Sequence, residues 1–211
     1  MGARYLDIAI TPEVAAAQAR RGSAGAYAHR LEALRAEGPV EADALGPAEA
    51  EFMAGRDGIY LATVSATGWP YIQYRGGPRG FLKVLDPHRI GFADFRGNRQ
   101  YLTVGNLATD DRVSLFLMDY AERRRLKLFG RATLIDPAAD AELAGRLAVA
   151  DYPARIERLV AITVEGFNWN CPQHITRRFD EPEVAAALIA RDRRIAELTA
   201  EIERLRGKAE A

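Results

Sequence analysis

The stretch GIYLATVSATGWPYIQYRGG, residues 58–77, has the pattern of a β-hairpin. Its two runs, residues 59–65 and 69–75, are rich in β-branched and aromatic residues, which favour strands. Between them lies Ala66-Thr67-Gly68, a sequence typical of a tight turn. We therefore predict two antiparallel strands joined by this turn.

More runs of strand composition follow, separated by Gly, Pro, Asp and Asn. They cover residues 80–86, 89–95, 112–120, 125–135 and 158–169. Two stretches with a helical pattern interrupt them, residues 99–111 and 136–151. Short strands at close spacing with few helices favour a small β-barrel over a parallel sheet.

Helical patterns stand on both sides of these strands. Thr11 and Pro12 form a helix-start signal, with threonine as N-cap and proline at the first helical position. We expect three segments in the chain. They are an N-terminal helical extension (residues 1–50), the barrel (residues 51–180) and a C-terminal helix (residues 181–211).

The C-terminal segment carries an apolar seam. Leu188, Ile195 and Ile202 lie seven residues apart, and Leu198 and Leu205 fill the alternate positions. The seam covers fewer than about three heptads, which is too short for a stable isolated coiled coil. Two interpretations stay open: the helix packs on its own domain, or it pairs with the same helix of a second copy.

Composition excludes several classes of protein. Lys+Arg and Asp+Glu are both 29, so no net charge draws the chain to nucleic acid or an anionic membrane. The single cysteine, Cys171, excludes an intrachain disulfide and a multi-cysteine metal site. Residues 1–12 lack a basic segment followed by an apolar one, and no long apolar run appears. We expect a cytoplasmic protein without nucleic-acid, membrane or metal partners.

Arginine and glycine gather at two points that suit a ligand. Gln73, Arg75 and Gly77 share one predicted strand face, and neighbouring glycines let a flat ligand approach the backbone. The segment Arg96-Gly97-Asn98-Arg99 ends a strand and opens a predicted helix. Free N–H groups at a helix start, together with two arginines, suit a phosphate.

A third basic cluster lies on a later strand. Arg123, Arg125 and Lys127 are expected on one face of it. Arginines are most often solvated surface charges, and that interpretation applies to each one alone. A small barrel, however, would bring the three clusters together.

From about Gly58 to Ala132 the chain resembles a known family. The hairpin is followed by "FADFRGNRQ", "DDRVSLFLMDY" and "RRLKLFGRA", in the order of the pyridoxamine 5′-phosphate oxidase-like, FMN-binding split β-barrel family. The likeness is closest to its "pyridoxamine phosphate oxidase-related" branch, in which "NWNCPQHI" also recurs. The resemblance implies a mainly β fold with flanking helices. It also implies FMN as the cofactor, held in a groove between the two subunits of a homodimer.

The resemblance also implies which residues meet FMN. Basic and amide side chains would hold its phosphate, Ala93 and Asp94 would line it through their backbone, and Arg125 replaces a glutamine that the family often directs at the flavin. The residues expected at the cofactor are Gln73, Arg75, Ala93, Asp94, Phe95, Arg96, Asn98, Arg99, Gln100, Arg125, Trp169 and His174.

Three departures bear on the substrate. Gln73 and Gln100 stand where pyridoxamine phosphate oxidases proper commonly have arginine and lysine. The segment "FNWNCPQHITRRF" also lacks the basic motif with which those enzymes grip the substrate phosphate. The resemblance therefore implies an FMN-dependent oxidoreductase that acts on an unidentified small molecule. Because no Gly-x-Gly-x-x-Gly fingerprint is present, an NAD(P)H donor would bind only transiently.

Other functions fit the same pattern. A protein that stores or senses FMN without turnover is one alternative, and a protein that binds another flat cofactor, such as haem or a deazaflavin, is a second. A general-stress or antioxidant role is a third. No residue pair has the pattern of a strong acid and base, so Cys171, His174 and Tyr101 are only candidates for catalysis.

The segment "NWNCPQHI", residues 168–175, admits several interpretations. Zinc needs three or four ligands, and Cys171 and His174 supply two. A Cys–His nucleophile pair lacks a nearby oxyanion site. Trp169 and Cys171 could simply be buried. We favour a wall of the flavin pocket, with Trp169 against a ring and the polar side chains at the edges of flavin or substrate.

Overall fold

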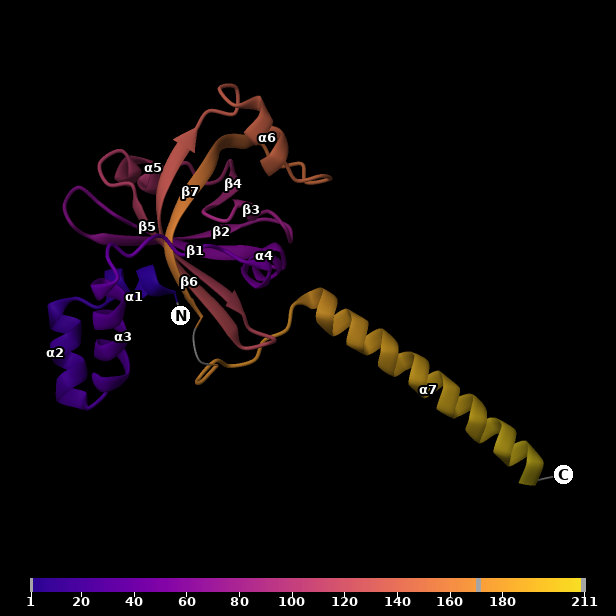
Figure 1. Ribbon diagram of the computed structural model, residues 1–211. Helices are drawn as coiled ribbons and strands as arrows, with labels where there is room; N and C mark the ends of the chain where they lie inside the picture. The colour runs from indigo at the N-terminus through magenta and orange to yellow at the C-terminus, as the bar shows by residue number, and fades with distance from the viewer. Residues whose placement is uncertain (1, 170–171, 210–211) are drawn as a thin grey trace. The chain divides into compact units, whose positions relative to one another are not determined.

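The computed structural model of the protein describes residues 2–169 and 172–209 (Figure 1). The chain divides into two compact units. The first comprises Met1–Asp119 and Arg124–Pro172, and the second Tyr120–Arg123 and Gln173–Ala211. The whole β-sheet lies in the first unit, and the long C-terminal helix lies in the second.

Four helices precede the sheet: α1 (Ala3–Ala9), α2 (Pro12–Arg21), α3 (Gly25–Ala36) and α4 (Pro47–Ala54). The predicted start signal of α2 is confirmed, because the Thr11 side chain accepts the N–H of Val14 at 3.3 Å. The same helix ends at Gly22, whose φ of 75° is left-handed and suits glycine.

Seven strands form one antiparallel sheet in the order β2-β1-β5-β6-β7-β4-β3. They are β1 (Gly58–Val64), β2 (Pro70–Gly76), β3 (Lys83–Asp86), β4 (Arg89–Phe95), β5 (Arg112–Asp119), β6 (Arg124–Ile135) and β7 (Ile156–Trp169). The predicted hairpin is confirmed, with a register that runs from Gly58↔Gly76 to Val64↔Pro70.

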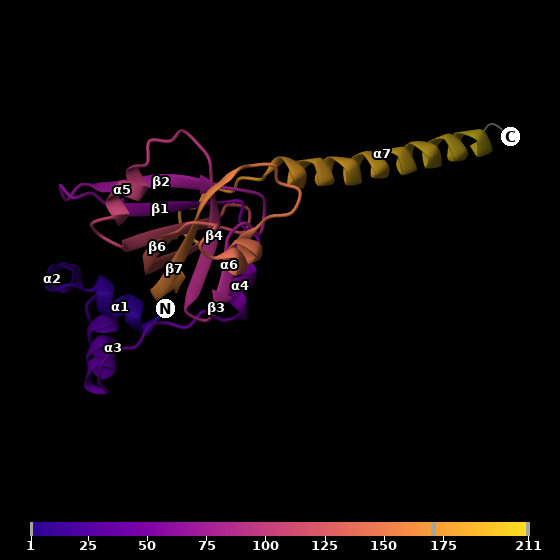
Figure 2. The same cartoon turned by 90° about the horizontal axis from the view of Figure 1, so that it is seen from above.

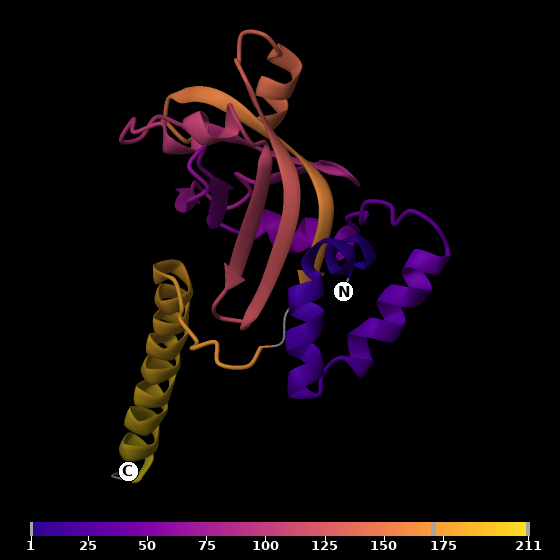
Figure 3. The ribbon, with the colours of Figure 1, turned by 90° about the vertical axis from the view of Figure 1, so that its left-hand side faces the viewer.

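The sheet curls until β2, at one end, approaches β4, the strand next to the other end. β2 and β4 do not pair in the sheet, yet Arg75 of β2 donates to Asp94 of β4 at 2.8 Å. Figure 3 shows β6 and β7 running side by side as long, curved strands that allow this curl. The expected fold is confirmed: a split β-barrel with flanking helices and a long C-terminal helix.

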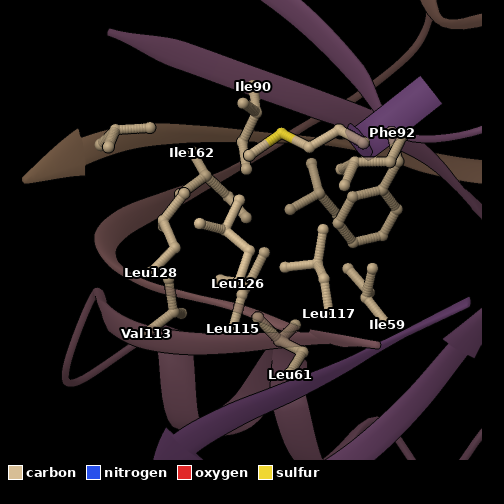
Figure 4. Close-up of a cluster of buried hydrophobic side chains, with 14 of the residues drawn as sticks. Ile59, Leu61, Ile90, Phe92, Val113, Leu115, Leu117, Leu126, Leu128 and Ile162 are labelled. Atoms are coloured by element: carbon tan, nitrogen blue, oxygen red, sulfur yellow. The ribbon is translucent and has the colours of Figure 1, made fainter. Parts of the chain in front are cut away.

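Alternate side chains of the strands fill the barrel. Leu115 and Leu117 of β5 meet Leu126 and Leu128 of β6, and all four are fully buried (Figure 4). Each fully buried leucine contributes about 1.5–3 kcal/mol relative to an exposed one. Helix α4 adds Phe52 and Met53 to the same core. These side chains form the main hydrophobic core of the protein.

Two predicted helices are shorter than expected (Figure 2). The stretch 99–111 yields only α5 (Leu102–Leu107), and 136–151 yields only α6 (Ala141–Leu147). Tyr101 has a φ of 56°, so the right-handed helix cannot extend back through it. α5 is fixed over β1 because the Asn106 amide donates to the Thr63 hydroxyl at 2.8 Å.

The N-terminal segment covers part of the outer face of β6 and β7. Tyr5 of α1 stacks on Phe129 with ring centroids 4.8 Å apart. A Cβ on Gly166 would lie 2.5 Å from the Tyr5 backbone nitrogen, so only glycine permits this approach. Asp43 holds the segment in place by accepting the N–H groups of Arg4, Tyr5 and Phe167.

The second unit is dominated by α7 (Glu181–Ala209), which Figure 1 shows as one unbroken helix. Arg178 lies over the Tyr120 ring at 5.0 Å within this unit. Among the helices described, none combines the length and the apolar character that a membrane crossing requires.

Candidate functional site

A polar pocket of about 170 Å³ opens where β2 faces β4. Its walls come from both strands, from the turn after β4, from α5 and from the start of β7. The lining residues are Gln73, Arg75, Asp94, Phe95, Gly97, Asn98, Arg99, Tyr101, Val104, Glu157 and Arg158. A second pocket of about 230 Å³ shares five of these residues and adds Ala93, Arg96 and Tyr152, among others.

The alternation of β2 places Gln73 and Arg75 toward the pocket. The Gln73 amide oxygen accepts hydrogen bonds from the Tyr71 hydroxyl and the Thr103 hydroxyl, each at 3.2 Å. These bonds fix the direction of the amide. The prediction that Gly77 shares this strand face is wrong, because β2 ends at Gly76.

Asp94 is the centre of the pocket's charge network. It is 5% exposed, accepts from Arg75 at 2.8 Å and accepts from Arg158 at 3.1 Å. Arg158 also donates to Glu157 at 3.0 Å. Burial raises the pKa of Asp94 above its ordinary value, and the two arginines act in the opposite direction.

Arg75 keeps one unused donor at this site. Its Nε is buried and has no hydrogen-bond partner among the residues that the structure describes. A buried donor without a partner costs about 1–3 kcal/mol. This Nε is closed off from the pocket, and a ligand oxygen would meet the 18% of the Arg75 side chain that stays exposed.

The turn after β4 is strained. Arg99 and Tyr101 have φ values of 61° and 56°, in the left-handed region. Such residues cost about 1–3 kcal/mol each and cluster at functional sites. Arg99 Nε donates to the Tyr101 hydroxyl at 3.2 Å, and that hydroxyl lies 3.4 Å from Glu157 Oε1. Asn98 closes the turn by accepting the N–H of Gln100 at 3.2 Å.

One part of the phosphate-site prediction is wrong. The helix was expected to open at Arg99, but α5 begins at Leu102 and has only six residues. Arg99 therefore gains nothing from a helix dipole, which acts within the first turn. What the turn does supply is the exposed guanidinium of Arg99, which lies at the pocket's edge.

The sequence match decides the family. Residues 45–171, well over half of the chain, match the family model described as "Pyridoxamine 5'-phosphate oxidase". The chain belongs to this family. A search of curated proteins found no match.

Several solved structures are similar to this member of the pyridoxamine 5′-phosphate oxidase family. HupZ from Group A Streptococcus is 17% identical, with 64% of this chain and 100% of that chain covered and a TM-score of 0.45. General Stress Protein 26 from Bacillus anthracis str. Sterne is 13% identical (56% and 88% covered, TM-score 0.44). An FMN-binding protein from Syntrophomonas wolfei subsp. wolfei is 12% identical (57% and 81% covered, TM-score 0.44). Likenesses this remote carry no argument about the cofactor or activity of this chain.

Within a single chain the third basic cluster does not line the pockets of the first two, and its place at the flavin stays a prediction for the groove between two copies. Arg125 and Lys127 lie on the side of β6 opposite the buried Leu126, and they line neither pocket. Lys127 instead lies over the Tyr5 ring at 5.3 Å. Arg123 has a φ of 54° and precedes the strand, which begins at Arg124. The Nε of Arg125 is buried and has no partner among the described residues.

Trp169 is occupied by protein contacts. Its indole N–H donates to Glu49 at 2.6 Å, and its ring meets Phe52 edge-on with centroids 4.7 Å apart. Arg124 lies over the same ring at 4.8 Å. Trp169 therefore packs against α4 and the core. It lines neither of the two pockets described above.

For two further candidates of the "NWNCPQHI" segment, a role at the cofactor stays a prediction. Cys171 lies outside the described residues. His174 is exposed and belongs to the second unit. Among residues 2–169 and 172–209, no group of three or more His, Cys, Asp or Glu side chains is placed to hold a metal ion.

Sequence reasoning missed Arg158, Glu157 and Tyr152. Arg158 stands opposite Asp94 in the β4–β7 pairing, sixty-four residues further along the chain. The strand that carries it was predicted, but no local signal gives the register between two distant strands. The sequence signal that could have indicated Arg158 is Asp94 on the predicted strand β4, because a buried carboxylate needs cationic partners.

Proposed function

We propose that this protein binds FMN, with the phosphate in the β2–β4 pocket, and uses it as an oxidoreductase on a small molecule. The observation that carries the proposal is Arg75, whose side chain lines an open polar pocket, is 18% exposed there and is held in place by Asp94 at 2.8 Å. A guanidinium offers phosphate two parallel hydrogen bonds, which a neutral donor cannot match.

The charge of the pocket supports an anionic ligand. Arg75, Arg99 and Arg158 line it, against the two carboxylates of Asp94 and Glu157. One positive charge is therefore left without a matching carboxylate at the pocket wall. Gln73 and Asn98 add amide N–H donors beside it.

The size of the pockets supports a site shared by two copies. The volumes of about 170 and 230 Å³ are each smaller than the roughly 300–1,000 Å³ of sites that enclose a whole ligand. One chain therefore has room for the phosphate end of FMN, and a second copy would enclose the rest. Arg125 lies on the outer face of the sheet, and we assign it to the groove completed by that second copy.

The chemistry divides between the cofactor and the chain. A bound flavin supplies the electron transfer. The chain's residues bind and orient it: Arg75 and Arg99 hold the phosphate, while Asp94 and Arg158 fix the direction of Arg75. Tyr101, one of the three candidates for catalysis, lines the pocket, and its hydroxyl lies between Arg99 and Glu157.

The cofactor released from the purified protein on denaturation is expected to be FMN rather than FAD. The pocket offers one anion site, and no pyrophosphate fingerprint occurs in the sequence. Chromatography of the released flavin measures this. FAD as the main species, or no binding after reconstitution with FMN, would contradict the proposal.

Bleaching of the bound flavin by NADH or NADPH separates an oxidoreductase from a storage protein.

The protein is expected to be a homodimer that survives removal of residues 181–211. The physical reason is that the flavin groove, and with it the main contact, is built by the barrel. Light scattering of the full-length and truncated proteins, each loaded with FMN, measures this. A stable 23.2 kDa monomer of the full-length protein with flavin bound would contradict the shared groove.

A further inference from the structure

Helix α7 exposes a row of large apolar side chains along its length. Every residue of it from Glu181 to Lys208 is exposed. Seven large apolar side chains are among them: Val184, Leu188, Ile189, Ile195, Leu198, Ile202 and Leu205. They remain 42–63% exposed, so no described residue of the second unit covers them. A contiguous apolar row of this kind marks an interaction surface.

The row has the order of a coiled-coil seam. Six of the seven side chains fall at the a and d positions of successive heptads, and Ile189 is the exception. Positions a hold Leu188, Ile195 and Ile202, and positions d hold Val184, Arg191, Leu198 and Leu205. β-Branched residues at a with leucine at d favour parallel two-stranded coiled coils, and residues 195–205 follow this rule.

The flanking charges favour the same parallel arrangement. In a parallel pair, Glu201 at position g lies opposite Arg206 at position e of the second copy, and this attractive contact occurs twice. An antiparallel pair that aligns the same apolar layers sets Glu201 against Glu201 of the second copy. It also sets Arg194 against Lys208, and its attractive contact is the one between Asp192 and Arg206. Like charges in such contacts are unfavourable.

We propose that α7 pairs in parallel with α7 of a second copy and forms a short two-stranded coiled coil. The seam is too short to be stable by itself. Two barrels held together by the dimer proposed above would tether the helices at an effective concentration on the order of millimolar. The pairing rests on that dimer and not on flavin, because no residue of α7 is assigned to the cofactor.

Disulfide cross-linking of the full-length protein tests this pairing. Cys171→Ser removes the only native cysteine, and Leu198→Cys then adds one at a d position. In a parallel pair the two new cysteines face each other across the seam, within the reach of a disulfide. Mild oxidation and a non-reducing gel should show the cross-linked dimer as the main species. The matched control is Ala200→Cys, two residues away on the outer face of the same helix, which should remain uncross-linked.

Equal cross-linking at positions 198 and 200, or none at 198, would overturn the proposal. Light scattering of the same samples separates the outcomes. A dimer without a cross-link at 198 contradicts the helix pairing alone, whereas a monomer contradicts the shared barrel groove as well.

A charge swap tests the direction of pairing in the Leu198→Cys background. Glu201→Lys should reduce cross-linking because the introduced lysine would face Arg206 of the second copy. The double change Glu201→Lys with Arg206→Glu should restore it, since the pair is reversed and remains attractive. In an antiparallel pair the same double change would place the introduced glutamate against Asp192, so failure to restore cross-linking overturns the parallel arrangement.

Discussion

Replacing Arg75 with alanine is expected to weaken FMN binding about 30- to 150-fold, which corresponds to roughly 2–3 kcal/mol. The change removes the charge-assisted hydrogen bonds to phosphate. It also leaves Asp94 with only Arg158 as a cationic partner, so the carboxylate repels the phosphate more strongly. Fluorescence titration of FMN into the cofactor-free protein measures the loss.

Matched variants make this test specific. Arg75→Lys should recover part of the loss, because a point charge cannot reproduce the planar fork. Arg99→Ala should cost less than Arg75→Ala, since the Arg99 side chain is exposed and its helix-dipole support is absent. Arg89→Ala removes an exposed arginine that pairs with Asp86 and should leave the affinity unchanged. An Arg75→Ala protein that stays folded and binds FMN within about threefold of the wild type would contradict the phosphate role.

Replacing Asp94 with asparagine is expected to strengthen FMN binding about tenfold at neutral pH. The ionised carboxylate neutralises Arg75 and Arg158, and a bound phosphate must compete with it. Asparagine has nearly the same shape but no charge, so both guanidinium groups would become available to phosphate. The folded state should lose stability at the same time, because removing one member of a buried ion pair leaves the others uncompensated.

The pH dependence of this difference has a defined sign. Burial raises the pKa of Asp94, so the wild-type carboxyl gains its proton at a higher pH than an exposed aspartate. A protonated Asp94 carries no charge, and neither does the asparagine that replaces it. The affinity ratio between Asp94→Asn and wild type should therefore be largest at neutral pH and fall toward one as the pH drops through the pKa of Asp94. A ratio that is independent of pH, or an asparagine variant that binds FMN more weakly at neutral pH, would contradict the competition.

The fold was readable from the sequence because its signals are local. The hairpin of β1 and β2 has strand composition on both sides of a glycine turn, and β4 was predicted with the bounds that the structure shows. The alternation in β5 and β6 identifies their inward side chains without further information. The predicted helix at residues 99–111 was longer than α5, because nothing in the sequence reveals the left-handed φ of Tyr101.

The candidate site was only partly readable. Gln73, Arg75, Asp94, Asn98 and Arg99 come together because β2 and β4 face each other across the split in the barrel. Arg158 was missed because its contact depends on the register of β7 against β4. Arg125 and Trp169 were grouped with the pocket, although in this chain they lie on the outer sheet face and against α4. Local patterns specify the face of a strand, whereas the meeting of two faces depends on the closure of the whole sheet.

The comparison of FMN with riboflavin tests the central claim most directly. The two ligands share the ring and the ribityl chain and differ only in the phosphate that we place beside Arg75. Calorimetric titration of both into the cofactor-free wild-type protein gives the two affinities under one set of conditions. The account predicts that FMN binds about 100-fold more tightly or better, in line with roughly 3 kcal/mol of phosphate binding. Equal affinities for FMN and riboflavin would contradict it, because the β2–β4 pocket would then contribute nothing to holding a phosphate.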